Sequence, residues 1–371
     1  MKNKTYKILL TGGGSGGSAA PLLAVYDQLK DQDKFEFLWL GTKFGPEREM
    51  AERAGIKFRA ISGGKWRRYF SLKNLSDLFK IKLGFWQAFF IMLNWRPDLV
   101  LSAGSFISVP AVWAAWLLRA PVLIHQQDIT PGLANRLMAP FAKVVTVAFE
   151  QSLKDYGDQA VWIGNPVRQS LAARSSQLAA RFEFKNNLPI VLVAGGGTGA
   201  EKINDLLYKS LPELISFCNL IHITGKGKAS ASYKLQVTSY ATFEFLDVNR
   251  MAAAMKAADL VVTRAGMGTL SELSYIGKPS IIIPMPESHQ QANAEYFKAK
   301  KAAVVAEQKD LTAAKFIDLI KYWLADKKNL ARLSENMGQA MKQGANQEVI
   351  KIIYKILNIK DNGFPTRLRE C

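Results

Sequence analysis

A glycine-rich turn occurs in each half of the chain. The two turns are Gly12-Gly13-Gly14-Ser15-Gly16-Gly17 and Gly195-Gly196-Gly197-Thr198-Gly199-Ala200. Glycine adopts backbone angles that other residues avoid, and it lets a phosphate or a sugar approach the main chain closely. A helix that begins at such a turn presents unpaired N–H groups and the positive end of its dipole to an anion. The sequence therefore predicts two phosphate-binding turns.

Two common nucleotide-dependent functions do not fit these turns. Gly12-x-Gly14-x-x-Gly17 matches the dinucleotide fingerprint, which also requires an acidic residue at the end of the next strand to bind the adenosine ribose. The next strand ends in Trp39-Leu40-Gly41 and has no acid there. Neither turn is followed by the Gly-Lys-Ser/Thr of a P-loop. A nicotinamide dehydrogenase and an ATP- or GTP-hydrolysing enzyme are therefore disfavoured.

A third segment carries groups that can bind a sugar nucleotide. It reads Arg264-Ala265-Gly266-Met267-Gly268-Thr269-Leu270-Ser271-Glu272. Arg264 follows an apolar strand, and Glu272 lies about two turns into the next helix, where its carboxylate can accept both ribose hydroxyls. Gln290 and Asn293 are three residues apart, so they share a helical face and can present amides to sugar hydroxyls. The alternative interpretation is an ordinary strand, turn and helix with a solvated glutamate.

The net charge of +18 is spread unevenly along the chain. One acid, Asp77, lies among nine basic residues, which are Arg53, Lys57, Arg59, Lys65, Arg67, Arg68, Lys73, Lys80 and Lys82. The apolar run 83–93 follows directly, and basic residues beside Phe, Trp and Leu are typical of a surface that binds anionic lipid. The alternative is a solvated basic loop followed by a buried helix. Nucleic acid is disfavoured as a partner, because the chain has no helix-turn-helix, zinc-finger or RNP-like pattern.

Cysteine, histidine and aspartate usage indicates neither a disulfide framework nor a metal centre. The chain has two cysteines, Cys218 and Cys371, and so few cysteines fit a reducing cytosol. The only Asp-x-Asp, Asp31-Gln32-Asp33, falls in a loop and is interpreted as a solvated turn, so we expect no metal or other cofactor. His222 lies inside a predicted strand and is interpreted as structural. The longest apolar stretches are about 13 residues, whereas a bilayer span needs roughly 20, and the first residues lack the apolar region of a signal peptide.

Short apolar strands alternate with helical stretches through most of the chain. Strands are expected at 7–11, 35–40, 98–102, 121–125, 143–148, 190–194, 220–224, 259–263 and 280–283, a helix at 18–30 and a helical tail at 310–358. This alternation predicts an α/β protein with two doubly wound, Rossmann-like parallel-sheet domains that face a cleft. We place the domains at 1–164 and 165–345, joined near Gly164-Asn165-Pro166, with a C-terminal helix and tail at 346–371. Ligands bind at the carboxyl ends of such strands, where both glycine turns lie.

These residues resemble the MurG family of membrane-associated glycosyltransferases over nearly the whole chain. The matching motifs, in order, are the first glycine turn with Pro21, Gly104-Ser105-Phe106 with Pro110, His125-Gln126-Gln127-Asp128, Pro131-Gly132-Leu133-Ala134-Asn135, Gly164-Asn165-Pro166-Val167-Arg168, the second glycine turn, Arg264-Ala265-Gly266, Glu272-Leu273 and His289-Gln290. The resemblance implies a GT-B architecture. It also implies inverting transfer of N-acetylglucosamine from UDP to lipid I, the undecaprenyl-pyrophosphate-linked muramyl-pentapeptide. The product, lipid II, serves peptidoglycan biosynthesis and hence cell-wall growth, cell shape and division.

The resemblance also implies a role for each matching residue. Arg168 would hold the donor diphosphate together with Gly196, Gly197 and Thr198, and Glu272 would hold the ribose. Phe245 and Leu246 would lie against the uracil, and Gln290 and Asn293 would bind the sugar. The remaining implied donor contacts are Arg264, Gly266, Met267, Gly268 and Thr269. The implied acceptor contacts are Gly13, Gly14, Ser15, Gly16, Gly17, Ser105 and Asn135. Residues 65–95 would rest on an anionic membrane at its cytoplasmic face, which makes the protein peripheral.

The acceptor side departs from the family pattern at the residues that would do acid–base chemistry. Ser18 replaces the histidine that usually follows the first turn, and a serine is too weak a base to take over its role. His-Gln-Gln-Asp replaces His-Glu-Gln-Asn, so Asp128 or His125 becomes the candidate base. Gly104-Ser105-Phe106 stands in place of Gly-Gly-Tyr, and Gly197-Thr198 in place of Ser-Gln. Two alternatives follow: a related UDP-sugar transferase with another lipid acceptor, and a UDP-sugar-binding scaffold with weakened catalysis.

Overall fold

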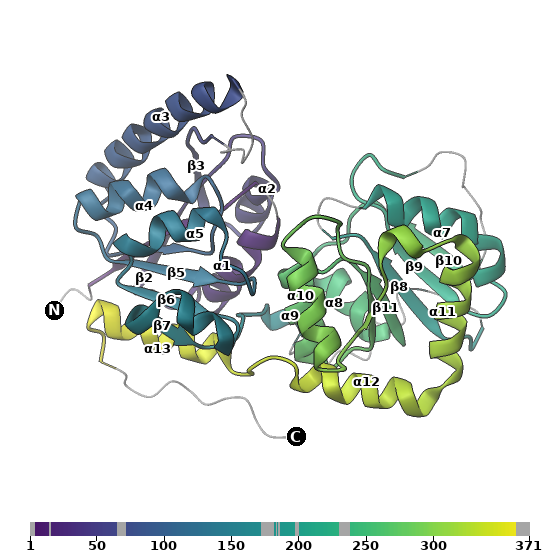
Figure 1. Ribbon diagram of the computed structural model, residues 1–371. Helices are drawn as coiled ribbons and strands as arrows, with labels where there is room; N and C mark the ends of the chain where they lie inside the picture. Colours follow the sequence, from purple (N-terminus) through teal and green to yellow (C-terminus); the bar gives the residue numbers. More distant parts are fainter. Residues whose placement is uncertain are drawn as a thin grey trace.

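The computed structural model describes residues 4–14, 16–64, 72–171, 182, 184, 186–196, 200–229 and 238–360. Two α/β domains lie side by side, and the chain passes from the first to the second once and returns at its C-terminal end (Figure 1). Each domain is a parallel sheet between helical layers, as the alternation of apolar strands and helical stretches predicts. The expectation of two doubly wound domains is confirmed.

The first sheet has seven parallel strands in the described residues, in the order β3-β2-β1-β4-β5-β6-β7. Their bounds are β1 Tyr6–Thr11, β2 Phe35–Gly41, β3 Lys57–Ala60, β4 Leu99–Ser102, β5 Val122–Gln126, β6 Val144–Val147 and β7 Ala160–Trp162. The helices between them are α1 Gly16–Leu29, α2 Pro46–Arg53, α3 Leu72–Trp95, α4 Ser108–Leu117 and α5 Leu133–Met138. Ile8, Leu10 and Leu99 are fully buried in the core on one face of the sheet, and Leu9 and Val100 in the core on the other face.

The second sheet has six parallel strands among the described residues, in the order β10-β9-β8-β11-β12-β13. Their bounds are β8 Ile190–Ala194, β9 Asn219–Ile223, β10 Tyr240–Phe243, β11 Leu260–Thr263, β12 Ser280–Ile282 and β13 Val304–Val305. The helices are α7 Glu201–Leu214, α8 Val248–Ala257, α9 Met267–Ile276, α10 Gln290–Ala299, α11 Ala313–Ala325 and α12 Lys327–Gln339.

Both strand orders reverse direction at a point that carries a glycine turn. In the first sheet the reversal lies between β1 and β4, and in the second between β8 and β11. The first glycine turn follows β1, and the second follows β8. Ligands of open α/β sheets bind at such switch points, outside the carboxyl ends of the strands. The topology therefore places each predicted phosphate-binding turn where this fold binds its ligands.

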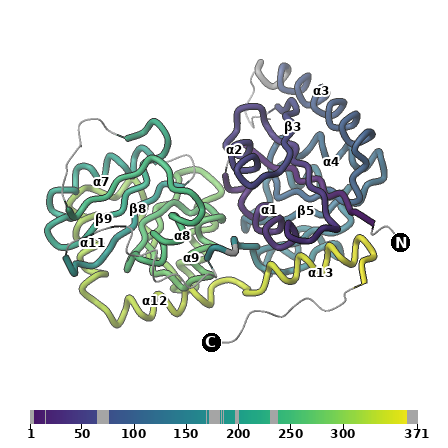
Figure 2. The backbone as a smooth tube through the Cα atoms, turned by 180° about the vertical axis from the view of Figure 1, so that it is seen from behind, coloured from purple at the N-terminus to yellow at the C-terminus, as the bar shows by residue number. Residues whose placement is uncertain are grey.

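The last helix, α13 (Ala345–Leu357), belongs structurally to the first domain. Its buried residues Val349, Ile350 and Ile353 join the core that Leu22 and Trp39 also form. Tyr354 Oη donates a hydrogen bond of 2.7 Å to Gln32 Oε1. Figure 2 shows α13 crossing beneath the first domain from behind. The chain therefore ties its two domains together at both the 163–168 connection and its C-terminal end.

Most expected elements are present, with differences at their ends. The expected strands coincide with β1, β2, β4, β5, β6, β8, β9, β11 and β12. The short strands β3, β7, β10 and β13 were missed, because two to four residues at a sheet edge show no clear alternation. The expected tail at 310–358 consists of α11, α12 and α13, which Asp326 and Gly344 separate. Asp31 and Asp33 lie between α1 and β2, as expected for a turn.

Helix α3 is amphipathic rather than buried. It packs on α4 through Ala88 and Met92, while Phe79, Leu83, Trp86 and other large apolar side chains of the helix are exposed. The alternative interpretation, a basic loop followed by a buried helix, is therefore wrong for residues 83–93, because α4 covers only one face of that helix. No helix of the described part of the chain is long and apolar enough to span a membrane.

Candidate functional site

A buried glutamate holds the first glycine turn in place. Glu47 Oε2 accepts a hydrogen bond of 3.0 Å from the Gly14 N–H. Its Oε1 accepts from the Thr42 N–H at 2.7 Å and from the Thr42 hydroxyl at 2.5 Å. Glu47 is fully buried, and a Cβ on Gly13 would displace its carboxylate from these hydrogen bonds. No local sequence pattern indicates this contact, since Glu47 lies 33 positions from Gly14.

Ser105 closes the first turn from the neighbouring strand. Its hydroxyl donates to the Gly13 carbonyl at 2.6 Å, and the Ser18 hydroxyl donates to the same oxygen at 3.4 Å. Ser105 has a φ of 101°, a conformation that costs energy for any residue with a side chain. Gly16 and Gly17 begin α1, and the N-terminal end of a helix carries the positive end of its dipole. Ser15 lies outside the described residues.

Gln126, the last residue of β5, forms a hydrogen-bond network that holds the loop after the strand. Gln126 donates to the carbonyls of Asp128 at 2.7 Å and Thr130 at 3.3 Å, and it accepts from Asn135 at 2.5 Å and Tyr156 at 3.0 Å. Burial raises the pKa of Tyr156, so it stays a neutral donor. Asn135 Oδ1 is buried with no hydrogen-bond partner in the described residues, so it can still accept from a ligand.

Both ring nitrogens of His125 have hydrogen-bond partners inside the protein. Its Nδ1 lies 3.0 Å from Thr146 Oγ1, and its Nε2 lies 2.6 Å from Asn165 Oδ1. Because Asn165 Nδ2 donates to Ser271 Oγ at 2.7 Å, its Oδ1 is the acceptor, and His125 carries its proton on Nε2. Burial lowers the pKa of His125 to about 4. The histidine therefore connects the two domains as a neutral group, and neither ring nitrogen is left for a substrate proton.

Asp128 contacts the second domain directly. Its Oδ1 accepts a hydrogen bond of 2.9 Å from Asn293 Nδ2, and Asn293 Oδ1 accepts from the Ile129 N–H at 3.2 Å. Asn293 is fully buried and also donates to the Ala265 carbonyl at 3.1 Å. Asp128 itself remains partly exposed. The candidate base and a predicted sugar-binding amide thus meet at the domain junction.

The partly exposed Arg168 pairs with the buried Glu272 on the side predicted to bind the donor. Arg168 Nε lies 3.1 Å from Glu272 Oε1, at an angle outside the hydrogen-bond range. Burial raises the pKa of Glu272, and the positive charge of Arg168 opposes that shift. A cavity of only about 10 Å³ remains beside them. The two side chains therefore contact each other in this structure, and a ligand with phosphate and hydroxyl groups would have to separate them.

Arg264 forms hydrogen bonds to the loops around it. Its guanidinium donates to the carbonyls of Ile283 and Pro284, both at 3.1 Å, and to Gln308 Oε1 at 2.6 Å. Gln290 Oε1 accepts from the Met285 N–H at 3.1 Å, which holds the same loop from the other side. Arg264 thus positions residues 284–290 rather than presenting its charge to a ligand.

The start of α9 lies against the first domain. Gly266 caps the helix, and Gly268 lies where an added Cβ would be 3.7 Å from the Ala20 Cβ of α1. Met267 is buried, and Thr269 is partly exposed. A small residue at 268 allows α1 and α9 to approach, which brings the two switch points to the same junction.

The predicted uracil contact lies next to α2 of the first domain. The Arg53 guanidinium lies 5.4 Å from the centre of the Phe245 ring, and Lys226 Nζ lies 5.6 Å from it. Phe245 is 44% exposed, whereas Leu246 is buried. Gly196 has a φ of 88° and open space around it, as a ligand-facing turn requires. Gly197 and Thr198 lie outside the described residues.

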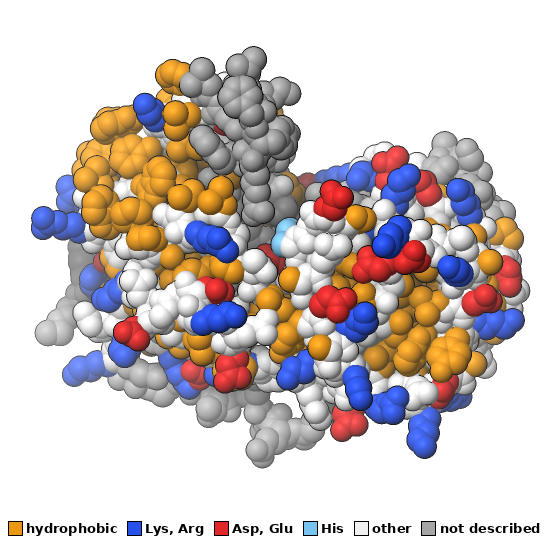
Figure 3. Space-filling view, in the orientation of Figure 1, with side chains coloured by type: hydrophobic (Ala, Val, Ile, Leu, Met, Phe, Trp, Pro, Cys, Tyr) orange, Lys and Arg blue, Asp and Glu red, His pale blue; other side chains and the backbone are white. Residues whose placement is uncertain are grey.

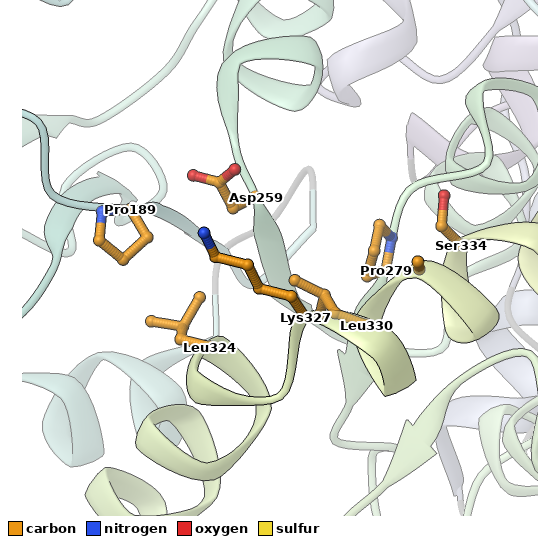
Figure 4. Close-up of a pocket in the computed structure, with 8 residues that line it drawn as sticks. Pro189, Asp259, Pro279, Leu324, Lys327, Leu330 and Ser334 are labelled. Atoms are coloured by element: carbon orange, nitrogen blue, oxygen red, sulfur yellow. The ribbon is translucent and has the colours of Figure 1, made fainter.

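A cavity of about 300 Å³ lies away from these residues. It is lined by Pro189, Asp259, Pro279, Leu324, Lys327, Leu330, Ala331 and Ser334 (Figure 4). Pro189, Asp259 and Pro279 directly precede β8, β11 and β12, so the cavity lies at the amino ends of the second sheet. The predicted site residues lie at the carboxyl ends. In the part of the chain that is described, no three His, Cys, Asp or Glu side chains gather as a metal site.

Comparisons with known proteins agree with this two-domain fold. The models for the glycosyltransferase family 28 N-terminal domain and C-terminal domain match residues 8–147 and 190–349. Two curated relatives carry the name UDP-N-acetylglucosamine–N-acetylmuramyl-(pentapeptide) pyrophosphoryl-undecaprenol N-acetylglucosamine transferase. The protein of Clostridium kluyveri is 38% identical over 94% of this chain and 99% of its own, and that of Clostridium tetani is 34% identical over 96% and 99%. This chain belongs to the MurG family.

The crystal structure of Acinetobacter baumannii MurG is similar over 94% of this chain and 99% of its own, with a TM-score of 0.70 and 25% identity. The GT-B architecture and the assignment to the glycosyltransferases are thereby confirmed. In this MurG family member, local sequence patterns indicate the candidate donor and acceptor motifs but not the supporting contacts of Glu47, Thr146 and Ser271. Each of these acts through partners far away in the sequence, so no local pattern indicated it.

Proposed function

We propose that the protein transfers N-acetylglucosamine from UDP-N-acetylglucosamine to lipid I, forming lipid II with inversion at the anomeric carbon. The hydrogen bond of 2.9 Å between Asp128 and Asn293 is the observation that supports this most directly. It brings the candidate base of the acceptor domain next to the candidate sugar-binding amide of the donor domain. A glycosyl transfer needs these two groups on either side of one anomeric carbon.

The donor diphosphate is assigned to Arg168 and the second glycine turn, and the ribose to Glu272. A bound UDP would replace the contact of 3.1 Å between Arg168 and Glu272 with two separate contacts, phosphate to guanidinium and hydroxyl to carboxylate. Phe245 and Leu246 are assigned to the uracil, and Gln290 and Asn293 to the sugar. Arg264 supports this site by holding residues 284–290.

Asp128 is assigned as the general base. The acceptor hydroxyl attacks the anomeric carbon, its proton passes to the Asp128 carboxylate, and the bond from that carbon to the UDP oxygen breaks. Arg168 and the helix N-terminus after the second turn stabilise the charge that develops on the diphosphate. His125 is assigned a positioning role, because both of its ring nitrogens bond within the protein. Ser18 is bonded to the first turn, which suits an acceptor-side contact rather than proton transfer.

The acceptor pyrophosphate is assigned to the first glycine turn with Ser105 and Asn135. Asn135 Oδ1, which is buried and has no hydrogen-bond partner among the described residues, would accept from the acceptor if binding uncovers it, and the N-terminus of α1 can bind the phosphates. Ser15 is included on the basis of the resemblance alone, since it lies outside the described residues.

The membrane contact is assigned to α3 and its neighbours. Phe79, Leu83, Trp86 and Phe90 are 52–67% exposed on α3, and Trp116 of α4 is 56% exposed. Figure 3 shows hydrophobic side chains gathered on the upper part of the first domain, where Figure 1 places α3 and α4. An exposed apolar area bordered by basic residues suits an anionic lipid surface at the cytoplasmic face of the membrane. The basic residues Lys65, Arg67 and Arg68 lie outside the described residues.

An activity assay tests the proposal. Purified protein with UDP-N-acetylglucosamine and lipid I should release UDP, with release dependent on lipid I and unaffected by EDTA. Preference for another UDP-sugar or another lipid would support the related transferase instead. UDP-sugar binding without UDP release on any lipid acceptor would contradict the proposed transfer and favour a binding scaffold.

A further inference from the structure

Helix α2 contacts the acceptor turn at its N-terminal end. Glu47, its second residue, is the fully buried carboxylate that accepts from the Gly14 N–H at 3.0 Å. Ala51, one turn later, is also fully buried and fixes the helix to the first domain. A shift of α2 would therefore move Glu47, and with it the hydrogen bond that sets the conformation of the first glycine turn.

The exposed side of the same helix contacts the donor domain. Glu49 is paired with Lys226, which lies in the loop after β9, and Glu49 also pairs with Arg53 at 2.5 Å. Lys226 and Arg53 both lie over the Phe245 ring, at 5.6 and 5.4 Å from its centre. The pairing with Lys226 holds the pKa of Glu49 below its ordinary value. Phe245 thus has cations from both domains beside it.

Helix α2 has only eight residues, so its two contacts lie close together. Glu47 and Arg53 are six residues apart, about 9 Å along the helix. A helix this short moves as one unit, because its backbone hydrogen bonds span most of its length. Movement imposed at Glu49 and Arg53 therefore reaches Glu47.

We propose that α2 couples the two substrate sites: its contact with Lys226 and Phe245 in the donor domain sets the position of Glu47 and hence of the acceptor-binding glycine turn. Glu47 and Glu49 are positioning residues in this scheme. The identity of the two ligands rests on the proposed function, whereas the coupling itself rests on the contacts of α2.

Kinetics test the role of Glu47. In Glu47→Gln one carboxylate oxygen becomes an NH2 group, which donates and does not accept. The single remaining oxygen cannot accept from both the Gly14 and the Thr42 donors. We expect the KM for lipid I to rise about tenfold, while the KM for UDP-N-acetylglucosamine stays within about twofold. Glu52→Gln is the matched control, because Glu52 pairs with Arg48 on the surface of the same helix. Equal changes in both KM values, or none, would overturn the role of Glu47.

A charge exchange tests the contact between the domains. Glu49→Lys and Lys226→Glu should each raise the KM for lipid I by about two- to fivefold, a modest effect because both side chains are largely exposed. The double variant restores opposite charges and should return to within about twofold of the wild type. Failure of the double variant to recover would contradict the proposed contact.

Hydrogen exchange separates this inference from the proposed function. UDP alone should slow amide exchange in the peptide that contains Gly14, although the expected UDP site lies in the other domain. The substitution Glu49→Lys should abolish this slowing. UDP should still bind Glu49→Lys with a Kd within about fivefold of the wild type, because the substitution reaches the assigned uracil contact only through the side chains of Lys226 and Arg53. Slowing in the wild type supports the coupling even if lipid I proves not to be the acceptor. Binding of UDP without any effect at Gly14 would refute it.

Discussion

Among single residues, burial separates the side chains that can exchange protons with a substrate from those that cannot. His125 is 3% exposed and bonded at both ring nitrogens, so it holds Asn165 in place. Asp128, only three positions later, is partly exposed at the domain junction. Both residues have the chemistry of a base in the sequence. Their different surroundings favour the aspartate.

Replacing Asp128 should therefore affect the chemical step more than binding. Asp128→Asn keeps a similar size and can still bond Asn293, but it cannot take the acceptor proton. We expect kcat to fall about 100-fold or more, with little change in the KM for UDP-N-acetylglucosamine. Steady-state UDP release measures this. Asp158→Asn, at an exposed position of the same domain, is the control. An unchanged kcat would exclude Asp128 as the base.

The two buried histidines predict loss of stability in acid. Burial lowers the pKa of both His125 and His222 to about 4 from an ordinary 6.5. Between these pH values the unfolded chain binds more protons than the folded one, so stability is full above about pH 6.5 and falls as the pH drops toward 4. Each histidine contributes on the order of 3 kcal/mol to this loss.

Thermal unfolding between pH 7.5 and 4.5 tests this dependence. His222 bonds Tyr240 and Asn204, and a glutamine can replace part of this network without titrating. The Tm of His222→Gln should therefore fall less steeply with decreasing pH than the wild-type Tm. Parallel pH profiles for the two proteins would show that His222 is not responsible.

At the scale of elements, the packing of α3 on its neighbours decides which of its apolar faces stays exposed. The run 83–93 is apolar on all sides in the sequence, which fits a buried helix and a membrane-binding helix equally well. Packing on α4 buries Ala88 and Met92 and leaves Trp86 and Phe90 exposed. The exposed face is therefore the one available to lipid.

Polar substitutions on that face should weaken vesicle binding. Trp86→Ser with Phe90→Ser removes two large apolar side chains that are more than half exposed, so the fold should tolerate them. We expect affinity for vesicles of anionic phospholipid, measured by co-sedimentation, to fall at least tenfold. Tyr322→Ser, at an exposed position of α11 in the other domain, should bind as the wild type does. Unchanged binding of the double variant would place the membrane contact elsewhere.

At the scale of the whole molecule, the chain ends by returning to the domain in which it began. Helix α13 follows the donor domain in sequence but contributes Ile350 and Ile353 to the core of the first domain. Asn346 Oδ1 accepts from the Val167 N–H at 3.0 Å, and its Nδ2 donates to the Val167 carbonyl at 2.8 Å. The stability of the acceptor domain therefore depends on residues more than 300 positions away from β1.

A cavity at Ile353 should destabilise the acceptor domain in particular. Ile353 is fully buried, so Ile353→Ala should cost about 2–5 kcal/mol of unfolding free energy. Limited proteolysis should then cleave first within residues 4–160, while the donor domain persists. Lys355→Ala, on the exposed side of the same helix, controls for helix propensity. Cleavage that begins in the donor domain would contradict this assignment of α13.

The sequence alone determined the two sheets and their glycine turns and indicated the candidate donor motifs, because these depend on strand and helix patterns and on residues close together in the chain. It did not determine which groups meet across the junction. Glu47 and Gly14, Asp128 and Asn293, and Asn165 and Ser271 are 33, 165 and 106 positions apart. Only tertiary packing decides such contacts, since it fixes which side chains lose water and must find a partner inside the protein. For that reason the donor motifs were recognisable from sequence, whereas the roles of His125, Glu47 and α2 became visible only in the fold.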